Sequence, residues 1–203
     1  MALVKYNNNS ISSVTALGSL PAGGLNLITT NTISSGVSSS SFTSNINSTY
    51  DTYLFKFINI HPASNNVTWS VNFRDGGSNF DATKTTTNFL ANHTEAGGGA
   101  GISYSTSQDL AQSTNYAPFN ENTYGTDADA SLCGEMFLFS PSSTTFVKHF
   151  ISRVNSYHNS NITQDNSVAG YCNVTAAIDG VDFKMTSGNI DSGVIKMYGL
   201  SKS

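Results

Sequence analysis

The sequence predicts an all-β fold: an antiparallel, jelly-roll-like β-sandwich of about eight to ten strands, preceded by an extended N-terminal arm. Three observations support this prediction. In several segments apolar and polar residues alternate with a period of two, as in half-buried strands. Turn-forming residues separate these segments about every 8–12 residues. No long segment repeats its apolar positions with the helical period of 3.6.

The composition is that of one uncharged, polar domain. The 203 residues include 31 Ser, 22 Thr and 23 Asn, whereas only 11% are charged and 38% are hydrophobic. Thr favours strands, and Ser and Asn favour turns. A surface with few charges also suits a protein that packs against copies of itself, because fewer charges must be desolvated. We divide the chain into an arm, residues 1–24, and a single sandwich domain, residues 25–203.

The arm is rich in Asn and Ser but carries apolar side chains among them. It is too apolar for a free tail and too irregular for a strand of the sandwich, so we expect it to become ordered against a partner. Gly23 and Gly24 would form the hinge to the domain. An arm folded back on its own domain is the alternative. The expected partner-binding residues are Leu3, Val4, Tyr6, Ile11 and Val14.

The first half of the domain contains the clearest strand pattern. We expect a strand over Leu25–Thr30, then a loop with a weak strand over Ser34–Ser48. Strong alternation predicts strands over Tyr50–Ile60 and Val67–Arg74. Pro62 ends the first strand, and Ala63–Asn66 forms the turn. We predict that these two strands form a hairpin.

The pattern weakens between residues 80 and 126. A strand is predicted over Thr85–Leu90, and one helical turn over Gln108–Gln112. The glycine-rich run at Glu95–Gly101 predicts a flexible loop. Long irregular stretches often carry function, so we interpret this part as an exposed functional loop.

The remaining strands are predicted over Leu132–Phe139, Phe146–Asn155 and Val168–Ala177, followed by a closing hairpin over Val181–Leu200. The alternation also predicts which side chains face the core. These are Phe55, Phe57, Trp69, Val71, Phe73, Phe137, Phe139, Phe183 and Met185.

Charge and hydropathy argue against several classes of partner. The formal net charge is −4 and the nine Lys and Arg residues are scattered, so we expect no nucleic-acid binding. No apolar run approaches the roughly 18 residues that a membrane span requires, so no membrane is expected. The N-terminus lacks the pattern of a secretory signal, which predicts synthesis and assembly in the cytoplasm.

Cys133 and Cys172 each fall within a predicted strand. In a reducing compartment we expect both to be buried free thiols. A disulfide between them stays an alternative if their strands are neighbours. Neither cysteine belongs to a CxxC pair or to a Cys-His cluster with metal-binding spacing.

No catalytic motif is present, and no enzymatic activity or cofactor is expected. His149 is interpreted as a core or interface histidine. Asp127 and Asp129 have the spacing of calcium ligands but lack the rest of a calcium loop, so a solvated loop is predicted and a metal site is the alternative. A pair of carboxylates for glycoside hydrolysis is a further alternative, but no pair stands out in the sequence.

Four blocks of the chain, within residues 50–81 and 131–200, resemble a family of virion structural proteins from tailed bacteriophages, especially marine ones. The first has the form YDxYxFxFxNIxPA, and the last has the form SGNIxSGxIKxYG. The matching positions are Tyr50–Ala63; Gly77, Ser78, Phe80 and Asp81; Leu138, Phe139, Pro141, Lys148, His149 and Phe150; and Ser187–Gly199.

The resemblance implies a non-enzymatic component of the virion, assembled in the host cytoplasm as a capsid decoration or a tail or fibre protein. It implies contacts with other virion proteins and with copies of the chain, a trimer being favoured. The alternative is a module that binds carbohydrate on the host surface, because aromatic rings can stack on sugars. The candidate glycan-binding residues, all in the irregular stretch, are Tyr104, Tyr116, Phe119 and Tyr124.

Overall fold

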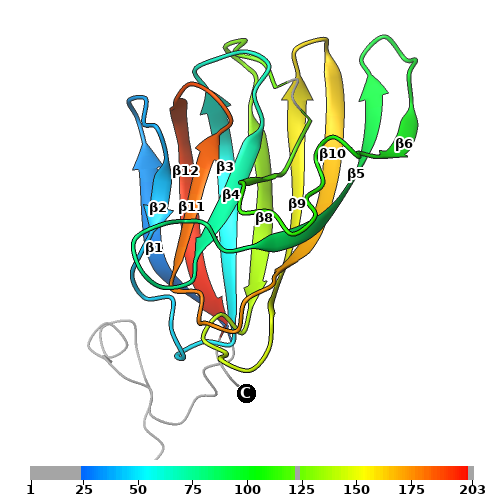
Figure 1. Ribbon diagram of the computed structural model, residues 1–203. Helices are drawn as coiled ribbons and strands as arrows, with labels where there is room; N and C mark the ends of the chain where they lie inside the picture. Colours follow the sequence, from blue (N-terminus) through cyan, green and yellow to red (C-terminus); the bar gives the residue numbers. More distant parts are fainter. Residues whose placement is uncertain (1–23, 122–123, 201–203) are drawn as a thin grey trace, which may run out of the picture.

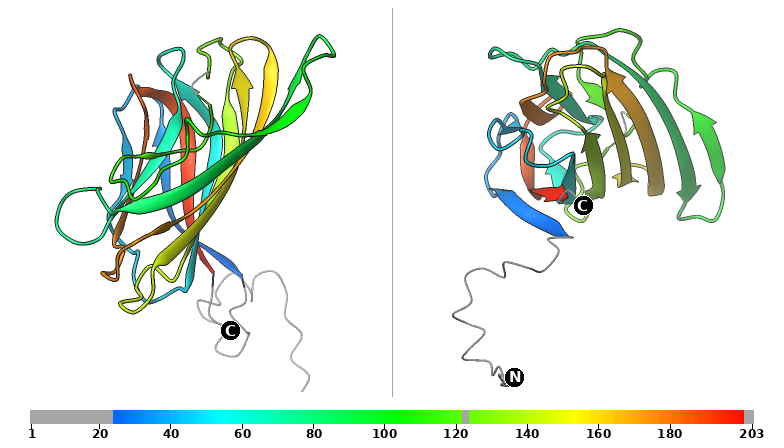
Figure 2. Two further views of the ribbon diagram at one scale, coloured as in Figure 1. Left: turned by 45° about the vertical axis from the view of Figure 1, so that its right-hand side comes forward. Right: turned by 90° about the horizontal axis from the view of Figure 1, so that it is seen from below.

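The computed structural model describes residues 24–121 and 124–200, which form two antiparallel sheets packed as a sandwich (Figures 1 and 2). The predicted all-β class is therefore confirmed, although there are more strands than expected. The residues of the arm that were predicted to bind a partner lie outside the described residues. The strands are β1 (Leu25–Ile33), β2 (Ser40–Phe42), β3 (Thr52–Pro62), β4 (Trp69–Arg74), β5 (Lys84–Thr94), β6 (Gly101–Tyr104), β7 (Ala117–Pro118), β8 (Leu132–Phe139), β9 (Lys148–His158), β10 (Ile162–Cys172), β11 (Gly180–Met185) and β12 (Ile190–Leu200).

The two sheets differ in size. The larger has the order β1-β12-β3-β8-β9-β10-β5-β6, and the smaller has the order β2-β11-β4-β7. The smaller sheet covers the part of the larger one around β12, β3 and β8, whereas β10, β5 and β6 extend beyond it (Figure 1).

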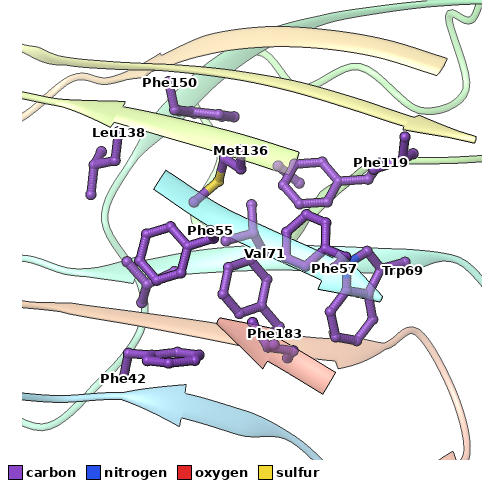
Figure 3. Close-up of a cluster of buried hydrophobic side chains, with 14 of the residues drawn as sticks. Phe42, Phe55, Phe57, Trp69, Val71, Phe119, Met136, Leu138, Phe150 and Phe183 are labelled. Carbon is purple, nitrogen blue, oxygen red and sulfur yellow. The ribbon is translucent and has the colours of Figure 1, made fainter. Parts of the chain in front are cut away.

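The core between the sheets is dominated by aromatic rings in edge-on contact (Figure 3). Phe183 of β11 lies 5.1 Å from Phe57 and 5.4 Å from Phe55, both on β3, measured between ring centroids. Phe42 of β2 adds a further edge contact with Phe55 at 5.3 Å. Such offset pairs place the positive edge of one ring against the negative face of another.

Both predicted hairpins are wrong. β3 and β4 belong to different sheets, and so do β11 and β12. Between the strands of each pair the chain crosses from one sheet to the other. Phe57 of β3 and Trp69 of β4 therefore meet across the core, at 5.7 Å between ring centroids. Two consecutive strands with apolar faces can pair edge to edge or pack face to face, and alternation does not distinguish the two.

The consecutive strands that do pair in the described ranges are β5–β6, β8–β9 and β9–β10. In the last of these hairpins Ile162 pairs with His158 and Cys172 pairs with Lys148. The prediction missed the first half of β10 because its inward-facing side chains, Gln164 and Asn166, are polar. Phe137 and Phe139 were also placed on the wrong face. Both are half-buried on the outer face of β8, and Met136 and Leu138 face the core instead.

The irregular stretch predicted as an exposed loop closes one open side of the sandwich. At one end its backbone bonds to β5, through Ser105 to Asn88 at 2.8 Å and through Ser113 to Lys84 at 2.9 Å. At the other end β7 pairs with β4, and Phe119 N donates to Trp69 O at 2.8 Å. No helical turn forms over Gln108–Gln112. Most of this segment is therefore held against the sandwich and does not form a free loop.

Candidate functional site

The outer face of the larger sheet is the part of the described structure that best fits a contact surface. A row of apolar side chains runs across six neighbouring strands of this face, and each pair of neighbours in it is directly opposite in the strand register. We call this the apolar row. It consists of Leu27, Tyr198, Leu54, Phe137, Ile151 and Ala169.

The apolar row is accessible at both of its ends. Leu27 is 55% exposed and Ile151 is 52% exposed, whereas Leu54, in the middle, is buried between its neighbours. A shallow hollow beside Ala169 is lined by Thr87, Ile151 and Tyr171, because Ala169 is smaller than the side chains around it. Apolar side chains that line up on the outer face of a sheet favour contact with a partner.

Ion pairs occupy the adjacent positions of the same face. Lys56 Nζ lies 2.5 Å from Glu135 Oε2, and Arg153 holds Asp165 through two nitrogens, at 2.5 and 2.9 Å. The Arg153 guanidinium lowers the pKa of Asp165 below its usual range. These charges are largely neutralised in place, so they present little net charge to a partner that approaches the apolar row.

The larger sheet ends in two edge strands, β6 and the longer β1. This strand is the last of the larger sheet, and its outer edge pairs with no other strand in the described ranges. Its nine residues, LNLITTNTI, contain neither a charge nor a proline. Most of its side chains are exposed, including Leu25 and Leu27.

The structure separates the four aromatic residues predicted to bind glycan. Phe119 and Tyr124 are buried, so neither ring can stack on a sugar. Phe119 fills the core beside Phe57, and the hydroxyl of Tyr124 donates to the carbonyl of Ile60. Burial raises the pKa of the Tyr124 phenol above its usual range.

Tyr116 is engaged on the outer face of the smaller sheet. Its hydroxyl donates to Asp182 Oδ2 at 2.7 Å, and Lys184 Nζ lies 4.1 Å from its ring centroid. Burial, followed by the bond to Asp182, raises the pKa of Tyr116. Ser41 donates to the other oxygen of Asp182 at 2.5 Å, so this carboxylate has a partner on each oxygen.

Tyr104 is the one member of the set that is well exposed, at 50%. It lies opposite Phe89, which is 49% exposed, across the β5–β6 pair. Its hydroxyl donates to Asp109 Oδ2 at 2.7 Å, and this bond raises the pKa of the phenol. Phe89 and Tyr104 are thus two exposed rings beside a carboxylate, an arrangement that suits stacking on a sugar. The sequence prediction had missed Phe89.

The cysteines do not form a disulfide. β9 lies between their strands, and Cys133 faces outward whereas Cys172 faces the core. The prediction that both thiols are buried holds for Cys172 and is wrong for Cys133. The buried thiol lies between two buried lysines, because Lys84 and Lys148 pair with it in register on either side.

Both lysines of this cluster bond to backbone carbonyls. Lys84 Nζ donates to Asn115 O at 2.7 Å, and Lys148 Nζ donates to Val174 O at 3.1 Å and to Ala176 O at 2.5 Å. Burial lowers the pKa of Lys84 to about 8 and raises the pKa of Cys172 to about 12. We assign the cluster a structural role, because its three side chains face the interior and the lysines hold loop backbone.

The other titratable candidates lie at the surface. His149 is exposed on β9, with its ring 6.1 Å from that of Tyr171, so it is not a core histidine. Asp127 contributes its backbone carbonyl, 3.2 Å from His61 Nε2. Among the residues that the structure describes, no group of three His, Cys, Asp or Glu side chains could hold a metal ion.

Comparison with known proteins gives no match to a family model, a curated protein or a solved structure. Across 24–121 and 124–200 there is also no helix long and apolar enough to cross a membrane.

Proposed function

We propose that this chain is a non-enzymatic structural component of a tailed-bacteriophage virion, exposed on the particle as a capsid decoration or a tail or fibre protein. The observation that carries the proposal is the apolar row on the outer face of the larger sheet. A row of this length, with Leu27 and Ile151 more than half exposed, favours a surface that a protein partner covers. The assignment to a phage particle rests on the resemblance of the four sequence blocks.

The chemistry of the same face supports a protein partner. The ion pairs Lys56–Glu135 and Arg153–Asp165 neutralise the charges beside the apolar row, so a partner can cover them without burying an unpaired charge. Only 11% of the chain is charged, which favours close packing of copies. The expected partners are other virion proteins and copies of the chain, in the virion and during assembly in the host cytoplasm.

A lysine in the apolar row tests the proposal directly. Phage that encode Ile151→Lys should incorporate the protein at a reduced level, because the charge would have to be desolvated in the contact. Ile102→Lys on β6 is the matched control, since Ile102 is 81% exposed and lies outside the row. Mass spectrometry of purified particles gives the copy number, and cryo-EM gives the location. Absence of the parent protein from the particles would overturn the proposal.

The exposed pair Phe89 and Tyr104 favours a second candidate, binding of carbohydrate on the host surface. A glycan array with the parent chain and with Tyr104→Ala distinguishes the two functions. A binder loses its signal with the substitution, whereas a purely structural component gives no signal with either chain. Phe119 and Tyr124 take no part in this candidate because their rings are buried.

A further inference from the structure

A second row of side chains crosses the outer face of the larger sheet beside the apolar row. On the strands that the two rows share, it lies one outward-facing position away, and its members are again opposite one another in the register. We call it the second row. It consists of Lys56, Glu135, Arg153, Ser167, Phe89 and Tyr104. Charged side chains form one end, two aromatic rings form the other, and only a serine lies between them.

The charged end of the second row borders an open hollow of about 560 Å³, a volume within the roughly 300–1,000 Å³ of known ligand sites. All four charged side chains in its lining are paired, as Lys56 with Glu135 and Arg153 with Asp165. Asn155 adds an amide to the lining. Its nitrogen donates to β10 at 2.9 and 3.1 Å, which leaves its oxygen as an acceptor. The hollow therefore offers hydrogen-bonding groups without an unpaired charge.

The aromatic end of the second row is the exposed pair Phe89 and Tyr104. The bond from the Tyr104 hydroxyl to Asp109 restricts the rotation of that ring. Ser167 lies opposite Phe89 on one side and opposite Arg153 on the other, and its small side chain leaves the path between them open. Two strand spacings, about 10 Å, separate β5 from β9. A ligand that contacts both ends must therefore be longer than one sugar ring.

We infer that the second row binds a neutral oligosaccharide, with one sugar unit against Phe89 and Tyr104 and another in the hollow. This inference rests on the carbohydrate-binding candidate above and names its site and ligand class. The apolar face of a sugar ring stacks on an aromatic ring. Its hydroxyl groups both donate and accept, so they can accept from Arg153 and donate to Asp165, and bonds to charged groups are the stronger ones.

The same features argue against other classes of ligand. A nucleic acid or an acidic polysaccharide needs cations that are free to pair with it, whereas Lys56 and Arg153 already hold carboxylates. An extended peptide is commonly bound through main-chain hydrogen bonds at an open strand edge. β8, β9 and β10 offer no such edge here, because each is paired on both sides. Sugar hydroxyls need only the side chains of the face.

Calorimetric titration of the full-length chain tests the inference. The probes are the disaccharide and the hexasaccharide of β-1,4-glucan, β-1,3-glucan, α-1,4-glucan and β-1,4-mannan. The parent should bind at least one hexasaccharide roughly tenfold more tightly than the matching disaccharide, because only the longer chain reaches both ends of the second row.

Two substitutions separate the ends of the site. Phe89→Ala should lower the affinity for the hexasaccharide to that for the disaccharide, whereas Arg153→Ala should weaken the binding of both. Phe146→Ala is the matched control, because Phe146 is an exposed ring outside the second row, and it should leave both affinities unchanged. Thermal melts of the three variants should match the parent, since all three side chains are exposed.

Three results would overturn the inference: no binding of any hexasaccharide, equal affinity for the two chain lengths, or an equal loss with Phe89→Ala and Phe146→Ala. The particle experiment is independent, because Phe89 lies outside the apolar row. Phe89→Ala chains that join particles at the level of the parent but bind no hexasaccharide would support both proposals. Failure of the titration with normal incorporation would leave the assembly function intact.

Discussion

Trp69 of β4 contacts both sheets through its side chain, and its backbone carbonyl accepts a hydrogen bond from Phe119 in the irregular stretch. Its indole stacks on Phe183 at 5.6 Å, meets Phe57 edge-on, and is fully buried. Trp69→Ala should lower the free energy of unfolding by about 3–5 kcal/mol, because it removes these contacts and leaves a cavity. Urea unfolding measures the loss. Phe146→Ala, at a position that is 72% exposed, should change the free energy by less than about 0.5 kcal/mol. Equal losses for the two variants would contradict the assignment of the core.

Lys84 gives the stability a specific dependence on pH. Its pKa falls from 10.5 to about 8 on folding, so between these values the unfolded chain binds more protons than the folded one. The contribution of Lys84 to the free energy of unfolding therefore rises with pH in this window, by at most about 1.4 kcal/mol per pH unit.

Lys84→Met should remove this rise. The quantity to follow is the difference in free energy of unfolding between the parent and the variant. The raised pKa of Cys172 lowers the stability of both proteins as pH rises above about 9, and the difference removes this shared effect. Denaturant unfolding from pH 7.5 to 10 should show the parent gaining stability relative to the variant. If the free energies of unfolding of the two proteins changed in parallel with pH, the ammonium group of Lys84 would be as well solvated in the folded protein as in the unfolded chain.

At the scale of elements, Gly134 permits the close approach of β8 and β9. A Cβ atom at this position would lie 2.4 Å from Arg153 O and 2.7 Å from Val154 Cα, both backbone atoms that cannot rotate away. Gly134→Ala should therefore cost about 1–3 kcal/mol. Gly101→Ala on β6 is the control, because its Cβ would meet Asn92 Oδ1 at an ordinary 3.6 Å. Chemical denaturation of both variants checks the difference.

Alternation predicted the existence of most strands but not their partners. β3 and β4 were recognised as strands, yet they lie in different sheets because their apolar faces pack across the core. In β8, apolar residues occupy both faces, so the pattern could not decide between Phe137 and Met136. The apolar row could not be predicted either, because its residues become neighbours only through the register of six strands. That β1 is an edge strand also depends on the order of all strands in the sheet, which alternation does not give.

At the scale of the whole molecule, the resemblance predicts a trimer. Light scattering should give three times the chain mass of 21.5 kDa. The low charge of the chain supports extensive polar contacts between copies but does not by itself set their number. A stable monomer in solution that also sits singly on the particle would contradict this prediction.

Deletion of residues 2–22 separates folding from attachment. The core and both sheets lie within the described ranges, so the shortened chain should keep a cooperative melt by circular dichroism. It should fail to join particles, because it lacks Leu3, Val4, Tyr6, Ile11 and Val14. A shortened protein that occupies particles at the level of the parent would show that the arm is not the anchor.

The position of β12 has a consequence for biosynthesis. This strand ends at Leu200 of 203 residues, yet it lies between β1 and β3, which are made first. Until β12 has emerged from the ribosome, β1 has no partner in the described sheet and β3 lacks one of its two. The larger sheet therefore cannot be completed before the last of the described strands has been made. A stalled or prematurely terminated chain would keep two long, nearly uncharged strand edges open to neighbouring nascent chains.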